Sequence, residues 1–217
     1  MRRAGGLSAC EAPRAVVAWG KTKEGDSDMG KAILYLADGT EECEALLCAD
    51  LLRRAGAEVI LAAAGGRREI VSSHGVTIRA DALAEEADIA GADLLILPGG
   101  WPGTKHLEDC PAVREAVLTF AAAGKPIAAI CAAPSILGHL GLLKGRRATA
   151  FPSFRKELAR AILTEGDVVR DGPFLTAPAW GRPSPSPWRW WRPWRVPPPR
   201  GTLRNASAGG RIKQKTA

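Results

Sequence analysis

Residues 124–135 read Gly124-Lys125-Pro126-Ile127-Ala128-Ala129-Ile130-Cys131-Ala132-Ala133-Pro134-Ser135. An apolar run of strand length ends at Cys131, and apolar residues at helical spacing continue from Ser135 to Leu143. This pattern predicts a buried strand that turns sharply into a helix, the arrangement called a nucleophile elbow. The amides and dipole of a first helical turn favour a thiolate. We therefore expect Cys131 to be a nucleophile; the alternative is a buried core cysteine.

Two more apolar runs end in polar or glycine-rich turns. The run Asp93–Leu97 is followed by Pro98-Gly99-Gly100, whose unhindered amides form a suitable nest for an anion. The run Ala32–Leu36 leads into Asp38-Gly39-Thr40-Glu41-Glu42-Cys43-Glu44, an acidic segment that opens a helix. Three such strand ends are typical of the carboxyl edge of an open parallel α/β sheet.

These three motifs, in this order, resemble the ThiJ/PfpI superfamily, in the branch of the parkinsonism-associated protein deglycase (the DJ-one branch). The resemblance covers about Met29 to Ala177. It implies a flavodoxin-like three-layer α/β sandwich with a mostly parallel sheet, usually as a homodimer. It also implies that Cys131 is an easily oxidised nucleophile and that Glu44 hydrogen-bonds it in the protonated form. The oxyanion hole is then formed by the amides of Gly99, Gly100 and the elbow, including Ala132.

Length and cysteine usage set the broad class. At 217 residues the chain can form one well-buried domain. Its five cysteines show neither paired spacing nor metal-ligand spacing, and no secretory signal is present, so we expect a cytoplasmic protein without a metal. No apolar run approaches the length of a membrane span, so we expect no membrane partner. The implied chemistry also requires no cofactor.

The positive charge is concentrated outside the predicted domain. Residues 178–217 carry nine basic and no acidic residues, and residues 1–28 carry one more basic than acidic residue. Of the total of +7, this leaves −3 on residues 29–177. The positive net charge of the whole chain therefore does not predict that the domain binds nucleic acid.

Residues 1–28 have no periodicity, and Lys23-Glu24-Gly25 can be encoded by a bacterial ribosome-binding sequence before Met29. We expect Met29 to be the true start, with a disordered native extension as the alternative.

The segment 178–217 is expected to be a disordered tail produced by a frameshift. Residues 178–199 hold most of the tryptophans among Pro, Ser and Arg, with no helical or strand periodicity. Stacking on single-stranded nucleic acid is the weaker interpretation. Restoring one C in plausible codons gives Thr-Ala-Pro-Gly-Met-Gly-Pro-Ala-Phe-Pro-Phe-Ala-Leu-Ala-Leu-Val-Glu-Ala-Leu-Ala, a turn followed by an amphipathic helix. The chain would then lack the helix that covers one face of its sheet, and we expect poor stability.

The remaining elements follow from the alternation of apolar runs and turns. We expect strands at 32–36, 58–63, 94–97 and 145–150, helices at 41–55, 82–87, 109–123 and 153–162, an edge hairpin over 65–78 and a hairpin over 168–176. Strands separated by helices imply right-handed parallel crossovers.

The candidate site suits carbonyl chemistry. The Cys131 thiolate would attack an α-oxoaldehyde, and a buried, neutral Glu44 would move a proton between carbon and oxygen. The glyoxalase III and deglycase activities attributed to the family imply a substrate such as methylglyoxal or a glycated protein.

Phe151 stands where some relatives place a histidine, so a protease triad is not expected. Three further residues are candidates for the pocket: Trp101 directly after the glycine turn, His106 six residues beyond that turn, and His74 in a loop. A second class of function stays open, a redox-responsive stress protein or chaperone in which Cys131 is oxidised.

Overall fold

The structure, a computed structural model, describes residues 30–179. The predicted leader, and the predicted tail beyond residue 179, lie outside the described residues.

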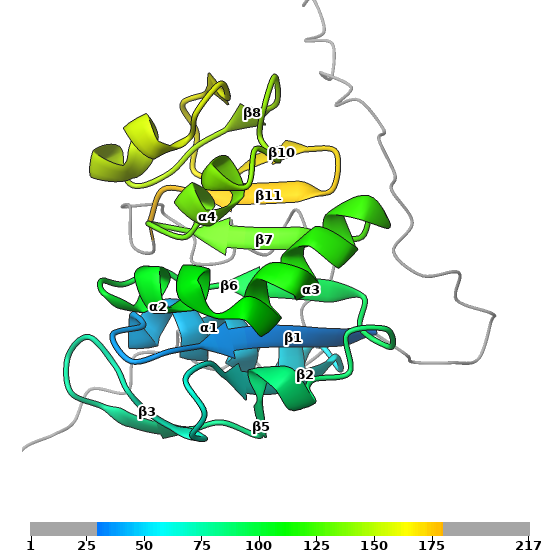
Figure 1. Cartoon of the computed structure of the whole chain (residues 1–217), viewed down its shortest axis with the longest axis vertical. Helices are drawn as coiled ribbons and strands as arrows, with labels where there is room; N and C mark the ends of the chain where they lie inside the picture. The colour runs from blue at the N-terminus through cyan, green and yellow to red at the C-terminus, as the bar shows by residue number, and fades with distance from the viewer. Residues whose placement is uncertain (1–29, 180–217) are drawn as a thin grey trace, which may run out of the picture.

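A seven-stranded sheet forms the centre of the molecule (Figure 1). Its strands in spatial order are β10 (Val169–Asp171), β11 (Phe174–Ala177), β7 (Ile127–Ile130), β6 (Leu94–Leu97), β1 (Lys31–Leu36), β2 (Glu58–Ala63) and β5 (Ala82–Leu83). All neighbouring strands are parallel except the hairpin of β10 and β11. The carboxyl ends of β1, β6 and β7 therefore meet at one edge, where the three motifs lie.

Helices cover both faces of this sheet. They are α1 (Glu42–Arg54), α2 (Gly103–Asp109), α3 (Pro111–Ala122) and α4 (Pro134–His139), with short 3₁₀ helices η1 (Ala84–Glu86) and η2 (Pro152–Glu157). Two small sheets complete the fold: β3 (Glu69–Val71) with β4 (Thr77–Arg79), and β8 (Arg147–Ala148) with β9 (Ile162–Leu163). No helix in the described part of the chain is both long and apolar enough to cross a membrane.

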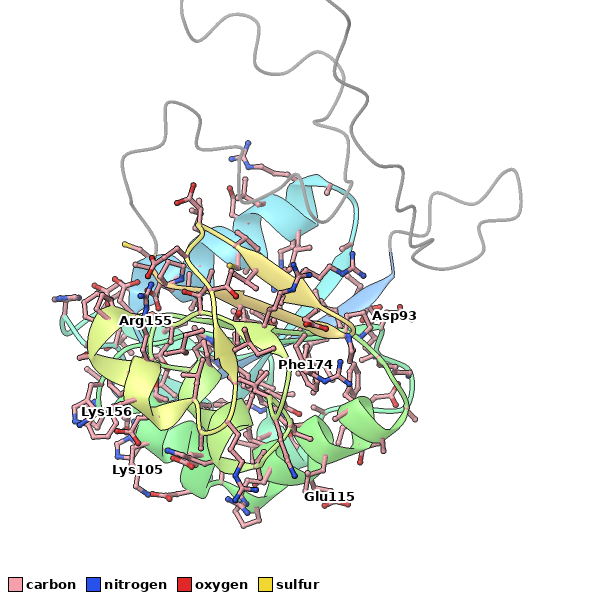
Figure 2. The ribbon with its side chains drawn as sticks, turned by 90° about the horizontal axis from the view of Figure 1, so that it is seen from above. Asp93, Lys105, Glu115, Arg155, Lys156 and Phe174 are labelled. Atoms are coloured by element: carbon pink, nitrogen blue, oxygen red, sulfur yellow. The ribbon has the colours of Figure 1, made fainter. Side chains whose placement is uncertain are left out.

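Alternation along β1 produces two cores. Ile33 and Tyr35 face α2, α3 and α4, whereas Leu34 and Leu36 face α1. All four of these side chains are fully buried. Figure 2, seen from above, shows α1 on one side of the sheet and the green helices on the other. The predicted three-layer α/β sandwich with a mostly parallel sheet is confirmed.

The predicted helix over 109–123 is shorter than expected and follows a helix that was not predicted. Cys110 has an extended backbone (φ −75°, ψ 116°), so α2 ends before it and α3 begins at Pro111. Proline is favoured at the first position of a helix because its missing N–H would have no helical partner there.

Two other predicted helices and one strand differ from the structure. The segment 153–162 forms the 3₁₀ helix η2 followed by β9, and Arg160 between them has a left-handed φ of 64° that no α-helix accommodates. The segment 82–87 splits into β5 and η1. The predicted strand at 145–150 is only two residues long and pairs with β9 outside the main sheet.

An apolar groove with an internal volume of about 60 Å³ lies beside α1 on one face of the sheet. Its lining comes from α1, from strands β6, β7 and β11, and from the residue before β10: Cys48, Leu51, Leu52, Ile96, Leu97, Ala128, Ala129, Ile130, Val168, Leu175 and Ala177. Ala128 and Leu175 lie on strands in the interior of the sheet, yet they are only half-buried. Ala177, the last residue of β11, lines this groove, so the residue that follows β11 lies at the groove's edge.

His139 links α4 to two other elements. Its Nδ1 lies 2.6 Å from Oε1 of Glu108 on α2, and its Nε2 lies 3.3 Å from Oε2 of Glu157 on η2. Burial opposes the charged ring, but hydrogen bonds and attraction from both carboxylates outweigh it and raise the pKa of His139. The ion pairs form only when the ring carries its proton.

We predict a pH-dependent contribution of His139 to stability. Because its pKa is raised in the folded state, the contribution is full below the ordinary histidine pKa of about 6.5 and is lost as pH rises through the folded value. The side chain is 39% exposed, so the effect should stay below about 1 kcal/mol. Urea melts of the chain and its His139→Gln variant should differ more at pH 5.5 than at pH 8.5. An equal difference in stability at both pH values would contradict a stabilising role of the protonated His139 ring.

Candidate functional site

The backbone at Cys131 has the strained geometry of a nucleophile elbow. Cys131 lies between β7 and α4 with φ of 61°, a left-handed conformation that side chains with a Cβ rarely adopt. Hydrogen bonds fix this residue on both sides: its N–H donates to Ala177 O at 2.9 Å, and its carbonyl accepts the Phe151 N–H at 2.8 Å. The end of β11 and the loop before η2 therefore hold the turn in place.

Glu44 approaches the same sulfur from the first turn of α1. Its carboxylate is buried, with the residue only 5% exposed, and its Oε2 accepts the Gly99 N–H at 2.9 Å. Glu41 begins the helix as its N-cap: its Oε2 accepts the Glu44 N–H at 2.6 Å, and its own N–H donates to Gly99 O at 3.0 Å. These contacts tie the start of α1 to the glycine turn after β6.

Only glycine fits at position 99. A Cβ there would lie 2.6 Å from Cys131 Cβ and 2.7 Å from Glu44 Oε2. At the next residue, Gly100 has φ of +94°, and a Cβ would lie 2.3 Å from Glu41 N. The two glycines allow the cysteine, the glutamate and the turn to pack at direct contact.

The surroundings of Cys131 raise the pKa of its thiol to about 12. Burial has the largest effect, followed by the negative charge of Glu44 and a hydrogen bond to its side chain; the N–H groups of Ala132 and Gly100 lower the pKa by less. The sequence-based prediction of a stabilised resting thiolate is therefore wrong in direction. Burial of the sulfur, together with the Glu44 carboxylate beside it, outweighs the two amides that hydrogen-bond it.

The amides around the sulfur divide into two sets. Those of Gly100 and Ala132 hydrogen-bond Cys131. The Gly99 amide is directed to Glu44 instead and orients that carboxylate. Of the three amides expected to form an oxyanion hole, two are therefore directed at the sulfur, and the third holds the acid.

The other predicted pocket residues lie on the loops around this centre. Trp101 is 60% exposed and Phe151 is 42% exposed. His106 on α2 is exposed, and its Nδ1–H donates to Asp38 O at 2.8 Å, which ties α2 to the loop after β1. None of these three contacts Cys131 through a side-chain hydrogen bond in the described structure.

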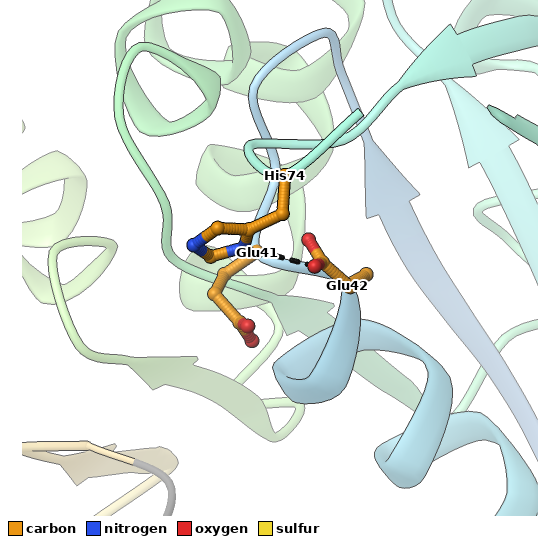
Figure 3. Close-up of side chains that lie close together, drawn as sticks. All are labelled: Glu41, Glu42 and His74. Atoms are coloured by element: carbon orange, nitrogen blue, oxygen red, sulfur yellow. Dashed lines mark hydrogen bonds and ion pairs between the residues drawn. The ribbon is translucent and has the colours of Figure 1, made fainter. Parts of the chain in front are cut away.

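His74 lies close to the acidic start of α1 (Figure 3). Its Nδ1 is 2.8 Å from Glu42 Oε1, and donor atoms of Glu41, Glu42 and His74 all lie within 4.8 Å of one another. Glu41 already accepts the Glu44 N–H, and Glu42 pairs with the histidine and lies 3.3 Å from Ser73 Oγ. Glu41 therefore acts as the helix cap, and Glu42 and His74 form an ion pair.

Two residues of the site were missed from the sequence. Glu41 was named as the start of a helix but not as the cap that positions Glu44, although the two are three residues apart, the spacing of an N-cap and N3. Phe154 on η2 packs against Trp101 with ring centroids 5.9 Å apart. Because the sequence predicted an α-helix over 153–162, this contact was not expected.

Comparison with known proteins identifies relatives with this arrangement of elements. The sequence profile of the DJ-1/PfpI family matches residues 30–184. Protein DJ-1 homolog B of Arabidopsis thaliana is 39% identical over 146 residues, which are 67% of this chain and 33% of that protein. The chain thus spans about a third of the length of the two Arabidopsis relatives that it matches.

Shorter relatives align over most of their length. A Pyrococcus abyssi protein named as a deglycase is 32% identical over 149 residues, which are 68% of this chain and 89% of that protein. The structure of Toxoplasma gondii DJ-1 in its oxidised form superposes with a TM-score of 0.67 at 36% identity, covering 69% of this chain and 82% of that one. From the elbow, the sheet and these matches together, the chain belongs to the DJ-1/PfpI family.

Proposed function

We propose that the chain is a cysteine-dependent enzyme that converts α-oxoaldehydes such as methylglyoxal to hydroxy acids, or removes them from protein adducts. One observation carries this proposal: a buried glutamate and two backbone amides converge on the sulfur of a cysteine held in a strained turn. This set supplies a nucleophile, a base and an oxyanion site without a cofactor. The deglycase name of the Pyrococcus relative supports the same class.

In this proposal Glu44 acts as an ionised base, in place of the neutral acid that the sequence suggested, because a thiol with a raised pKa needs a proton acceptor. The thiol keeps its proton until substrate is bound, and Glu44 then takes this proton as the sulfur attacks the aldehyde carbon. A C–S bond forms, and the aldehyde oxygen becomes an oxyanion within reach of the Gly100 and Ala132 amides. Protonation of that oxygen gives a hemithioacetal.

The second step moves hydrogen between two carbons of the substrate. Glu44 removes the proton from the carbon bonded to sulfur and returns a proton to the neighbouring ketone carbon. The first carbon is oxidised to a thioester while the second is reduced to an alcohol, so no external oxidant is needed. Water then cleaves the C–S bond, which releases lactate and restores the thiol. Methylglyoxal and one water thus give one lactic acid.

The stoichiometry tests this proposal. Each methylglyoxal consumed should appear as one lactate, measured by lactate dehydrogenase coupling beside a carbonyl assay. A thiol that only scavenges the aldehyde would consume methylglyoxal without lactate, up to about one equivalent per cysteine, and this outcome would overturn the proposal.

The alternative function is a redox-responsive stress protein or chaperone. One comparison favours it: the similar Toxoplasma structure is named as oxidised. In this alternative, Cys131 becomes a sulfinate held by Glu44 and the amides, and turnover is incidental. Peroxide should then switch on a binding activity, whereas the enzyme consumes methylglyoxal without any peroxide treatment. A homodimer and a cytoplasmic location remain predictions for either function.

We predict an unusual pH profile for alkylation of Cys131. Because burial and Glu44 raise its pKa, the rate with iodoacetamide should still increase above pH 9 in the unmodified chain. Glu44→Gln removes the negative charge, so the midpoint should move to lower pH. Mass spectrometry of the peptide that contains Cys131 separates it from the exposed Cys43. A midpoint below about pH 7 in the unmodified chain would instead support a resting thiolate.

A further inference from the structure

Three aromatic side chains gather around the elbow, and two of them are exposed. Trp101 is 60% exposed and Phe151 is 42% exposed, although large apolar side chains are usually buried. The Trp101 ring contacts Phe154 with centroids 5.9 Å apart and planes inclined by 44°. We refer to Trp101, Phe151 and Phe154 as the aromatic rim.

Backbone contacts hold the two segments that carry the rim against the Cys131 turn. Trp101 directly follows Gly100, whose amide hydrogen-bonds Cys131. On the other side, Phe151 N–H donates to the Cys131 carbonyl, and the Phe154 N–H donates to Phe151 O at 2.8 Å. The contact of the Trp101 and Phe154 rings therefore joins the two loops that flank Cys131.

The exposed rings suit an apolar, planar partner. Aromatic pairs at centroid distances of about 4.5–7 Å attract one another beyond the effect of burial alone, and Trp101 still has an exposed surface for a second ring. A methyl group, as in methylglyoxal, is too small to cover such a surface. An aryl group next to the ketone of a substrate offers an apolar ring that matches such a surface.

We propose that the aromatic rim makes aryl-bearing α-oxoaldehydes better substrates than methylglyoxal, with Trp101 and Phe154 as specificity-determining residues. This inference rests on the proposed enzymatic function. For phenylglyoxal the atoms balance as before: the aldehyde carbon is oxidised through the thioester, the ketone carbon is reduced to an alcohol, and one water releases mandelate. The aryl ring takes no part in the bonds that form and break.

The first experiment compares kcat/KM for phenylglyoxal and methylglyoxal in the full chain. The phenylglyoxal:methylglyoxal ratio should exceed the ratio of their rates with a free thiol. Trp101→Ala and Phe154→Ala should each lower it about three- to tenfold, mainly through a higher KM for phenylglyoxal. Trp101→Phe should restore most of the ratio. Leu118→Ala, at an exposed leucine on α3, is the matched control and should leave it unchanged. An equal ratio in all variants would overturn the inference.

A second experiment separates this inference from the proposed function. N-benzyl iodoacetamide and iodoacetamide alkylate Cys131 without any catalytic turnover, and their rates are measured by mass spectrometry of the same peptide. The aryl reagent should react faster at Cys131, and Trp101→Ala should remove this preference. If the preference holds but neither aldehyde is turned over, the rim binds aryl groups and the proposed function fails. If both aldehydes are turned over without an aryl preference in either assay, the rim assignment is wrong.

Discussion

Glu44→Gln should lower kcat/KM for methylglyoxal by about 10²- to 10⁴-fold, the range typical of a lost general acid–base group. The glutamine side chain has the same shape, and its amide oxygen can still accept the Gly99 N–H that Glu44 accepts at 2.9 Å. Glutamine cannot accept the thiol proton, however. Removal of this proton is necessary for attack because the pKa of Cys131 is raised. The loss should therefore fall on kcat as well as on kcat/KM.

A neighbouring carboxylate provides the matched control. Glu42→Gln removes a negative charge from the same helical turn, but Glu42 pairs with His74 rather than with the sulfur. Its kcat/KM should stay within about threefold of the unmodified chain. Thermal melts of both variants show whether the fold is kept. A Glu44→Gln variant that is folded and as active as Glu42→Gln would contradict the role of Glu44 as the base.

Restoring the reading frame after β11 should strongly stabilise the domain. Under the frameshift hypothesis the restored segment is predicted to form an amphipathic helix with Leu, Val and Phe side chains, and the groove beside α1 presents an apolar surface at the end of β11. Burial of two of these side chains contributes about 3–6 kcal/mol. For a domain of this size the melting temperature should rise by about 6–24 °C. The chain as given should melt at lower temperature and bind a hydrophobic dye.

The comparison needs a control for the added length. A restored segment with the same composition in scrambled order adds the same residues without an apolar face, and it should give no stabilisation. A sharp melt of the chain as given, without dye binding and at the same temperature as the restored protein, would show that the groove does not require this helix.

The fold was largely predictable because its strands are strongly patterned. Buried parallel strands appear as continuous apolar runs, as in Leu94–Leu97, and each ends in a turn with distinctive residues. Short elements were harder to predict. The segment 153–162 contains good helix formers, but the left-handed Arg160 and pairing with β8 take precedence over local propensity. Such long-range pairing has no signal in the local sequence.

The clustering of the candidate residues was predictable from the sequence, but their electrostatics were not. Cys131, Glu44, Gly99 and Gly100 come from three distant motifs, and the parallel sheet brings their strand ends together. The thiol pKa depends on how deeply the sulfur is buried and on contact with Glu44, and neither quantity can be obtained from residue order. The dipole of the helix after Cys131 lowers the thiol pKa, but burial and Glu44 raise it by more.

The central claim is that the sulfur of Cys131 carries the reaction, and lactate formation tests it most directly. The protein to measure is the frame-restored chain starting at Met29, beside its Cys131→Ala and Glu44→Gln variants and the chain as given. The account predicts many turnovers by the restored protein and none above background with Cys131→Ala. If the original chain is inactive, the loss lies in its first 28 residues or in its tail, the two segments in which the proteins differ. A folded, restored protein that is no faster than its Cys131→Ala variant would contradict the account and favour the redox or chaperone function.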